Sequence, residues 1–231
     1  ALQIKKSIKQ AGRSVRIIPN NEPALNSAQV LRNQLTGKLG MELVLVRNGT
    51  TSILAQTVQE QDIDAYAARD HGRPHRDAKV GMLPPKLAQI IVNLAVGQSA
   101  STKRKAQGEE STMLLDPFCG TGVILQEAQL MGLGVYGTDL EPRMAEYSKA
   151  NMQWLQKTFQ PPGQSWRIET ADATTFRWPH PFTVIAGETY LGRPFSTPPD
   201  PLTLKEVMQD VNHIHQKFLR NVALQTEPGF Q

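Results

Sequence analysis

Residues 113–130 read MLLDPFCGTGVILQEAQL, and this stretch decides the fold. An apolar run ends at Asp116, a turn containing Gly120 and Gly122 follows, and an apolar helical pattern then begins. Glycine lets a backbone turn sharply and approach a ligand closely, and a helix N-terminus presents free N–H groups. The stretch therefore predicts a strand, a ligand-binding loop and a helix in succession.

The same alternation of strand and helix continues to the end of the chain. We expect strands at 112–116, 134–138, 166–170 and 182–186, and helices at about 122–131, 141–157 and 201–221. Strands separated by helices at this spacing form a parallel sheet. The sequence thus predicts an α/β fold with a Rossmann-like sheet.

The first 58 residues have a different organisation. We expect a basic helix over 2–11, a strand over 14–19, a helix over about 27–38, and strands over 42–47 and 51–58. Asn26 is the expected N-cap of the second helix, and Asn48-Gly49 is a strong hairpin signal between the two later strands. These residues therefore form a small α/β unit of their own.

A connector dense in charge, residues 59–83, leads into the larger part. Pro84-Pro85 open an apolar helix that runs to about Val96, since prolines are tolerated in a first turn. Residues 97–111 are polar and predict a loop.

Composition excludes several classes of protein. The 231 residues are 39% apolar and 20% charged, which is ordinary globular composition and excludes wholesale disorder. No apolar run approaches the roughly 20 residues that span a bilayer, so we expect no membrane segment. The single cysteine, Cys119, excludes an internal disulfide and fits a reducing compartment, hence the cytoplasm. Because the chain opens on Ala1 rather than Met, we expect a fragment.

Positive charge is concentrated at the start of the chain. The net charge is +4, while residues 1–47 hold eight basic and two acidic side chains. This imbalance favours an anionic partner for the first part. A solvated charged surface is the alternative.

Three acids lie at the C-terminal ends of successive predicted strands. Asp116 opens the glycine-containing turn, Asp139 comes 23 residues later, and Asp172 follows the third strand. Position 125 is Leu, so the third glycine of a dinucleotide fingerprint is missing, and the acidic opening suits an ammonium group rather than a pyrophosphate. Asp139 is placed to bind ribose hydroxyls and Asp172 an adenine amino group, at the edge where open α/β sheets bind ligands. For Asp172 the alternative is a helix N-cap.

These motifs resemble those of a known group. DPFCGTG, residues 116–122, resembles the first motif of class I S-adenosylmethionine-dependent methyltransferases, with Asp139 and Asp172 at the second and third motif positions. RDHGRPHRDAKVGMLPPKLAQIIVNLA, residues 69–95, resembles the segment before the methyltransferase domain in the THUMP-containing tRNA guanosine-N2-methyltransferases, which act at tRNA position 10 in archaea and eukaryotes. Residues 1–58 are similar to the C-terminal part of a THUMP domain, a tRNA-binding module.

The resemblance implies three segments, a cofactor and a set of site residues. The segments are a partial THUMP-like module (1–58), the connector (59–83) and a class I methyltransferase domain (84–231). The cofactor is S-adenosylmethionine, and no metal is expected. The implied cofactor-binding residues are Lys79, Met82, Leu83, Asp116, Phe118, Gly120, Gly122, Asp139, Leu140, Asp172 and Ala173. The implied phosphate-contacting residues on tRNA are Lys5, Lys6, Lys9, Arg13, Arg16 and Arg32. Arg76 and Asp77 belong to the same motif; for these two residues, a structural ion pair within the connector is the alternative to a role in the site.

One motif departs from the family pattern. These enzymes carry Asp/Asn-Pro-Pro-Tyr after the fourth strand, where an oxygen accepts from the target amino group and the ring stacks on the base. Here the sequence is Gly187-Glu188-Thr189-Tyr190. Either Glu188 supplies the acceptor, with Tyr190 as the stacking ring, or the site has lost catalysis.

The sequence predicts an S-adenosylmethionine-dependent methyltransferase acting on the N2 amino group of a tRNA guanosine. A non-catalytic tRNA-binding protein with the same fold is the alternative, and a DNA amino-methyltransferase is a second. In this group three strands normally follow the last predicted helix, whereas LQTEPGFQ is all that follows it here. We therefore expect the C-terminal strands of the sheet to be missing.

Overall fold

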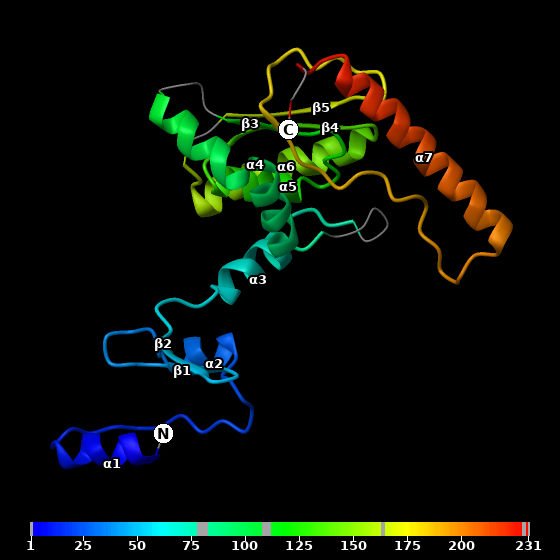
Figure 1. Cartoon of the computed structure of the whole chain (residues 1–231). Coiled ribbons are helices and arrows are strands. Elements are labelled where there is room, and N and C mark those ends of the chain that lie inside the picture. The colour runs from blue at the N-terminus through cyan, green and yellow to red at the C-terminus, as the bar shows by residue number, and fades with distance from the viewer. Residues whose placement is uncertain (1, 78–82, 108–111, 163–164, 228–229, 231) are drawn as a thin grey trace. The chain divides into compact units, whose positions relative to one another are not determined.

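The computed structural model describes residues 2–77, 83–107, 112–162, 165–227 and 230. The chain divides into two compact units, Ala1–Ala65 and Tyr66–Gln231, and the border lies inside the predicted connector (Figure 1). No helix in the described ranges is long and apolar enough to cross a bilayer.

The smaller unit contains two helices and a hairpin. Its elements are α1 (Leu2–Gln10), α2 (Ser27–Arg32), β1 (Leu43–Asn48) and β2 (Thr51–Gln56), with the two strands antiparallel. Asn26 caps α2 as predicted. Its side-chain oxygen accepts from the Gln29 N–H at 2.9 Å, while the Gln29 side chain accepts from the Asn26 N–H at 3.0 Å. This reciprocal pair satisfies N–H groups that a helix start would otherwise leave unpaired.

Three local predictions in this unit are wrong. Residues 14–19 are not a strand, because β1 and β2 pair only with each other in the described part of the unit, which leaves this segment no ladder to join. The second helix ends at Arg32 rather than near 38, since the backbone turns left-handed at Gln34 (φ 52°). In the hairpin, Asn48 pairs with Thr51, so the two-residue loop is shifted by one from the predicted Asn48-Gly49.

The larger unit is built on a parallel sheet, as predicted. Its strands are β3 (Met113–Asp116), β4 (Gly134–Asp139), β5 (Trp166–Thr170) and β6 (Val184–Ile185), in the order β5-β4-β3-β6. All three pairings are parallel. The carboxyl ends of the four strands therefore meet at one edge, where the predicted site residues follow them.

Helices α4 (Pro85–Gln107), α5 (Val123–Leu130), α6 (Pro142–Phe159) and α7 (Pro201–Ala223) cover the faces of this sheet. A further helix, α3 (Ile63–Gly72), meets α5 through the Arg69–Glu127 pair. Side chains alternate between faces along a strand. Leu114 accordingly packs in the core formed with α4, α5 and α6, which Figure 1 shows stacked beneath the strands. Leu115 points the other way and packs in a second core with Phe218 of α7.

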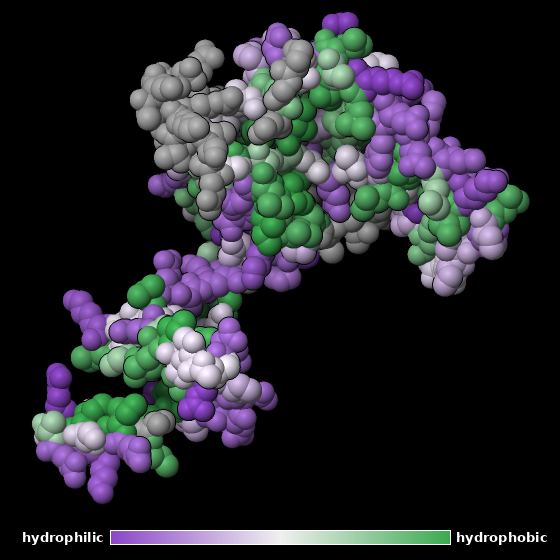
Figure 2. Space-filling model, in the orientation of Figure 1, coloured by the Kyte–Doolittle hydropathy of each residue, from purple (hydrophilic) through white to green (hydrophobic). Residues whose placement is uncertain are grey.

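Part of the exposed side of α4 is apolar. Leu87, Ile90 and Leu94 are exposed, and Figure 2 shows hydrophobic side chains gathered over the first half of this helix. On its inner side Ala88 and Val92 are fully buried.

Two predictions around α4 need correction. The charged connector contains a helix, α3, which its composition did not indicate. The predicted loop over 97–111 is also wrong as far as the structure describes it, because α4 continues to Gln107. Gly97 breaks the helical geometry with φ 63° and ψ 158°, which is where the predicted apolar helix ends, and helical backbone then resumes.

Candidate functional site

The glycine loop, residues 116–122, is held between the sheet and α6. The Cys119 N–H donates to the Thr138 carbonyl at 2.9 Å, which ties the loop to β4. Gly122 caps α5 with φ 81°, and a Cβ at this position would lie 2.3 Å from Ser148 Oγ. Both the left-handed backbone and the close approach require glycine here. Gly122 is therefore a fixed requirement of this loop's shape.

Asp116 begins this loop and is 2% exposed. Its Oδ1 accepts the Phe118 N–H at 3.2 Å. Burial raises the pKa of the Asp116 carboxyl to about 8, with the negative charges of Asp139 and Glu188 adding to the effect. A buried carboxyl of this kind is suited to a cationic group, which would restore its charged form.

Asp139 is the last residue of β4 and binds the same loop. Its Oδ2 accepts the Gly120 N–H at 2.8 Å and its Oδ1 accepts the Glu141 N–H at 2.9 Å. Burial raises the pKa of this carboxyl as well. Since an ionised carboxylate offers about four acceptor sites, further lone pairs remain for ligand hydroxyl groups. The neighbouring Leu140 is exposed.

Asp172 follows β5 and organises a turn. Its Oδ1 accepts from the Thr174 N–H at 2.8 Å and from the Thr174 hydroxyl at 2.7 Å, and its carbonyl accepts the Phe176 N–H at 2.8 Å. The alternative of a helix N-cap for Asp172 is wrong, because the residues that follow it form a turn and no helix. The next residue, Ala173, is buried, and its carbonyl accepts from the Asn221 side chain of α7 at 2.9 Å.

The segment after β6 passes directly over Asp116. A Cβ on Gly187 would lie 2.8 Å from Asp116 Oδ1, so a side chain there would require Asp116 or the backbone to shift. Glu188 is exposed, and Tyr190 is 41% exposed. The Tyr190 carbonyl lies 3.0 Å from His215 Nε2 on α7. This contact ties the backbone of the segment to α7 and leaves the two side chains exposed.

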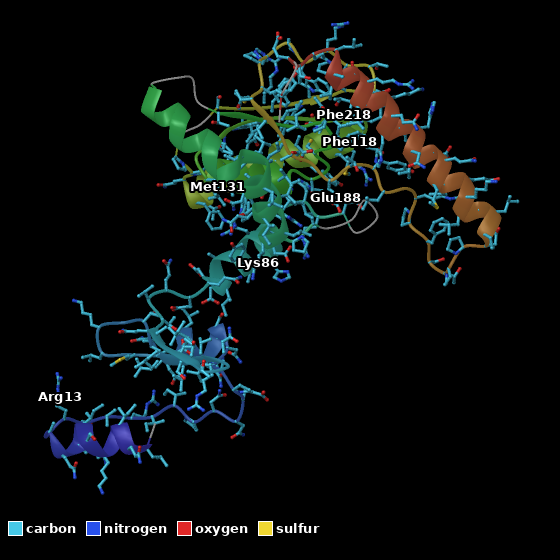
Figure 3. The ribbon with its side chains drawn as sticks, viewed as in Figure 1. Arg13, Lys86, Phe118, Met131, Glu188 and Phe218 are labelled. Atoms are coloured by element: carbon cyan, nitrogen blue, oxygen red, sulfur yellow. The ribbon has the colours of Figure 1, made fainter. Side chains whose placement is uncertain are left out.

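An aromatic pair lies on the α7 side of the loop. Phe118 meets Phe218 edge to face, with ring centroids 5.1 Å apart (Figure 3). The contact joins the glycine loop to the second apolar core.

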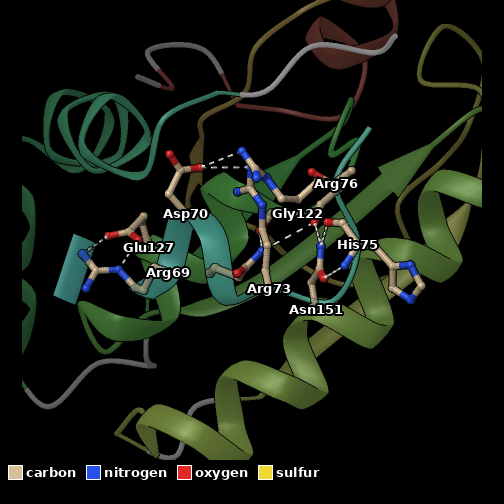
Figure 4. Close-up of polar contacts among 10 residues, drawn as sticks. Arg69, Asp70, Arg73, His75, Arg76, Gly122, Glu127 and Asn151 are labelled. Carbon is tan, nitrogen blue, oxygen red and sulfur yellow. Dashed lines mark hydrogen bonds and ion pairs between the residues drawn. The ribbon is translucent and has the colours of Figure 1, made fainter. Parts of the chain in front are cut away.

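Sequence reasoning missed a buried polar cluster beside the glycine loop (Figure 4). Arg69 of α3 pairs with Glu127 of α5 at 2.6 Å, and Asn151 of α6 is fully buried. The available signal was their position, since Glu127 and Asn151 are polar residues within otherwise apolar helix faces. Arg76 and Asp77, considered as a pair with each other, lie near other partners: Arg76 is 4.0 Å from Asp70, and Asp77 is 3.0 Å from Arg143.

The structure brings most, but not all, of the predicted cofactor-binding residues together. The structure brings Asp116, Phe118, Gly120, Gly122 and Asp139 together in and against the glycine loop, with Asp172 and Ala173 on the adjoining strand end. Leu83 packs on the apolar core that includes Cys119 and Val123, whereas Lys79 and Met82 lie outside the described residues.

The predicted phosphate-contacting residues lie in the smaller unit. Lys6, Lys9, Arg13, Arg16 and Arg32 are exposed and Lys5 is half-buried. Arg16 donates to the Asn33 side chain at 3.0 Å. In the described ranges no three potential metal-ligating side chains lie together.

Comparison with known proteins identifies relatives among archaeal enzymes. The chain is 44% identical over 86 residues to a protein of Methanothermobacter thermautotrophicus named tRNA (guanine(10)-N2)-dimethyltransferase, covering 37% of this chain and 22% of that protein. A protein of the same name from Pyrococcus abyssi is 34% identical over 121 residues, covering 51% of this chain and 31% of the relative. The chain thus spans less than a third of these curated relatives.

Similarity to solved structures is distant. An S-adenosylmethionine-dependent methyltransferase from Clostridium acetobutylicum is 15% identical, with 72% of this chain and 53% of that chain covered and a TM-score of 0.36.

A family model described as RMKL-like, methyltransferase domain matches residues 73–218. The match begins in the segment before α4, includes the glycine loop and all four strands of the parallel sheet, and ends in α7. It covers more than half of the sequence, and the chain therefore belongs to the RMKL-like methyltransferase domain family.

Proposed function

We propose that the chain binds S-adenosylmethionine at the carboxyl edge of its sheet and methylates the N2 amino group of a guanosine in tRNA. The relatives named tRNA (guanine(10)-N2)-dimethyltransferase support the substrate and the position. In this proposal residues 1–58 form the tRNA-binding module, 59–83 the connector and 84–231 the methyltransferase domain. We also propose the cytoplasm as its location, because the substrate is tRNA.

The observation that carries the proposal is the glycine loop with its two carboxylates. Asp116 is buried at the start of the loop, and Asp139 Oδ2 accepts the Gly120 N–H at 2.8 Å. The left-handed Gly122 then opens α5, where free N–H groups gather. Such an edge accommodates a ligand that carries a cation at one end and hydroxyl groups at the other.

Each strand end has its own proposed role in cofactor binding. Asp116 pairs with the ammonium group of the methionine moiety. Burial raises the pKa of its carboxyl, and a neighbouring cation would favour the ionised form. Asp139 accepts from the ribose hydroxyls beside Leu140, and Asp172 with Ala173 lies against the adenine. We assign Phe118, Gly120, Gly122, Lys79, Met82 and Leu83 to the methionine end.

The segment after β6 supplies the proposed contacts to the base. When bound, S-adenosylmethionine supplies an electrophilic methyl group on a sulfonium. The exposed Glu188 carboxylate accepts an N–H hydrogen bond from the target amino group, which directs the nitrogen lone pair at the methyl carbon. Tyr190, also exposed, stacks on the base after it leaves its helical stack.

Basic residues of the smaller unit, exposed except for the half-buried Lys5, are the proposed contacts to tRNA phosphates. They are Lys5, Lys6, Lys9, Arg13, Arg16 and Arg32. Phosphate contacts position the nucleic acid and weaken steeply with salt.

One observation favours a second candidate, a tRNA-binding protein without catalysis. Gly187 stands where the family carries Asp or Asn, and a Cβ there would lie 2.8 Å from Asp116 Oδ1, so a larger side chain would need Asp116 or the backbone to shift. A non-catalytic protein would retain the cofactor or RNA site while lacking transfer.

Transfer of labelled methyl from S-adenosylmethionine to unmodified tRNA, followed by nucleoside identification, tests the proposal. We expect N2-methylated guanosine from the wild-type chain. Glu188→Ala should lose transfer by about 100-fold while cofactor affinity stays unchanged. Glu206→Ala, an exposed glutamate on α7, is the matched control and should retain activity. Cofactor binding without transfer by the wild-type chain would instead support the non-catalytic candidate.

A further inference from the structure

One buried side chain joins the segment before α4 to the glycine loop. Asn151 of α6 accepts the His75 N–H at 2.9 Å and donates to the His75 carbonyl at 2.9 Å. The same amide nitrogen donates to the Thr121 carbonyl at 2.9 Å (Figure 4). Both amide hydrogens and the amide oxygen of this fully buried side chain are therefore engaged.

The loop carbonyls are fixed from two sides. Gln126 of α5 donates to the Gly122 carbonyl at 3.0 Å, next to the carbonyl that Asn151 holds. Because a peptide group is planar, fixing the Thr121 carbonyl also fixes the direction of the Gly122 N–H, which donates to the Cys119 carbonyl at 2.7 Å. The two amides thus set the orientation of adjacent peptide groups in the glycine loop.

Residues 75–77 lie along α6 through further contacts. The His75 ring stacks on Tyr147 with centroids 4.3 Å apart and planes 9° from parallel. Asp77 pairs with Arg143 at 3.0 Å. Of these contacts between α6 and the segment, the amide of Asn151 is the one that reaches the glycine loop as well.

We propose that Asn151 is a positioning residue for cofactor binding. This inference rests on the proposed function, because it concerns the same site. Asn151 holds the glycine loop in its binding geometry and fastens His75, and with it the described segment before α4, to that loop. Without the amide, the His75 N–H and carbonyl lose this partner, and the Thr121 carbonyl keeps only the Gln126 side chain at 3.5 Å. The loop and the segment are then held together less firmly.

Gln129 offers a matched control on α5. It is also a fully buried amide, and its Nε2 donates to the carbonyls of Leu133 at 3.1 Å and Ser165 at 3.2 Å. Those residues precede β4 and β5, so the control contacts lie at the edge of the sheet opposite to the glycine loop.

The experiment compares Asn151→Leu with Gln129→Met, each of which replaces a buried amide by an apolar side chain of similar size. Cofactor affinity is measured by calorimetric titration with S-adenosylmethionine, and thermal unfolding is followed in parallel. We expect both variants to lower the melting temperature, since each leaves buried polar groups unpaired. Asn151→Leu alone should raise the cofactor Kd by about tenfold or more, the lower range for loss of a supporting contact around a metal ligand.

Tyr147→Ala keeps the inference testable if Asn151→Leu does not fold. It removes the ring that stacks on His75 and leaves the amide in place, so we expect a smaller rise in Kd, about threefold, in a folded protein.

The outcomes separate the two proposals. A wild-type chain that fails to bind the cofactor would overturn the proposed function and this inference together. Wild-type binding with an unchanged Kd in folded Asn151→Leu would overturn the inference alone, as would an equal loss of affinity in Gln129→Met. If only Tyr147→Ala folds, an unchanged Kd in that variant would overturn it.

Discussion

The segments that follow β3 and β6 leave adjacent strands of one sheet, yet they are held differently. In the glycine loop the Phe118 and Gly120 N–H groups donate to the Asp116 and Asp139 carboxylates, and the loop is buried against α6. In the segment after β6, Glu188 and Tyr190 are exposed. The proposed cofactor-binding segment is thus preorganised by hydrogen bonds to its backbone N–H groups, whereas the proposed base-contacting segment presents side chains to solvent.

The largest effect should come from breaking the glycine loop. Gly122→Ala places a methyl group 2.3 Å from Ser148 Oγ at φ 81°, so we expect a loss of cofactor affinity of about 100-fold, the scale of an ångström-sized displacement at a binding site. Calorimetric titration measures it.

Gly132→Ala is the control for this change. Its backbone is equally left-handed (φ 83°), but the nearest atom to a new Cβ is 3.9 Å away. It should cost about 1–2 kcal/mol of stability from the backbone alone and leave the affinity unchanged. Equal affinity losses in both variants would show that backbone strain, and not the loop's contact with α6, governs binding.

The buried carboxyl of Asp116 should make both stability and binding depend on pH. Its folded pKa, about 8, lies above the ordinary value of 3.8, so the folded state retains a proton that the unfolded state releases. The free energy of unfolding should therefore fall as pH rises from about 4 to about 8, by linkage. Asp116→Asn should remove this dependence, which denaturant titrations at pH 5 and pH 9 would measure.

The same variant should bind S-adenosylmethionine at least about tenfold more weakly, because the neutral amide cannot pair with an ammonium group. In the wild type, affinity should increase as pH rises toward 8 and the carboxyl ionises. Wild-type affinity in the Asp116→Asn variant would contradict the role we propose for Asp116.

A smaller effect should come from a change where the segment after β6 approaches the glycine loop. Gly187→Ala puts a Cβ 2.8 Å from Asp116 Oδ1 and 3.4 Å from Pro117 Cδ. We expect the segment after β6 to shift and methyl transfer to fall about tenfold, with a change in cofactor Kd of only about twofold. Steady-state kinetics alongside titration would separate the two quantities. A large loss of cofactor affinity with transfer otherwise intact would contradict the division between the two segments.

The smallest effect should be on the interaction with tRNA alone. Tyr190→Leu removes the exposed ring and should raise the KM for tRNA several-fold, since stacking of a base on an aromatic ring contributes about 1–3 kcal/mol. The cofactor Kd should not change. Tyr190→Phe keeps the ring and is the matched control; a loss in Tyr190→Phe as large as in Tyr190→Leu would argue against stacking.

Local sequence patterns predicted the parallel sheet and failed where contacts are distant. The strand MLL, the glycine loop and the following helix lie next to one another in the chain, so periodicity and turn chemistry were sufficient. Residues 14–19 alternate like a strand, but a strand also needs a neighbour, which the pattern does not supply.

The candidate site shows the same limit. The carboxylates at the strand ends could be predicted because parallel strands end at a common edge. The role of Asn151 could not, since its partner His75 is 76 residues away in the chain and only the fold brings the two together. The departure at Gly187 was visible in the sequence, but its close approach to Asp116 required the structure.

Hydrogen–deuterium exchange of the chain with and without S-adenosylmethionine tests the central claim most directly. The account predicts that the cofactor slows exchange in residues 116–122, at Asp139–Glu141 and around Asp172, while exchange in α1 and in the β1–β2 hairpin is unchanged. Protection that appears elsewhere, or none at saturating cofactor, would contradict a cofactor site at the carboxyl edge of this sheet.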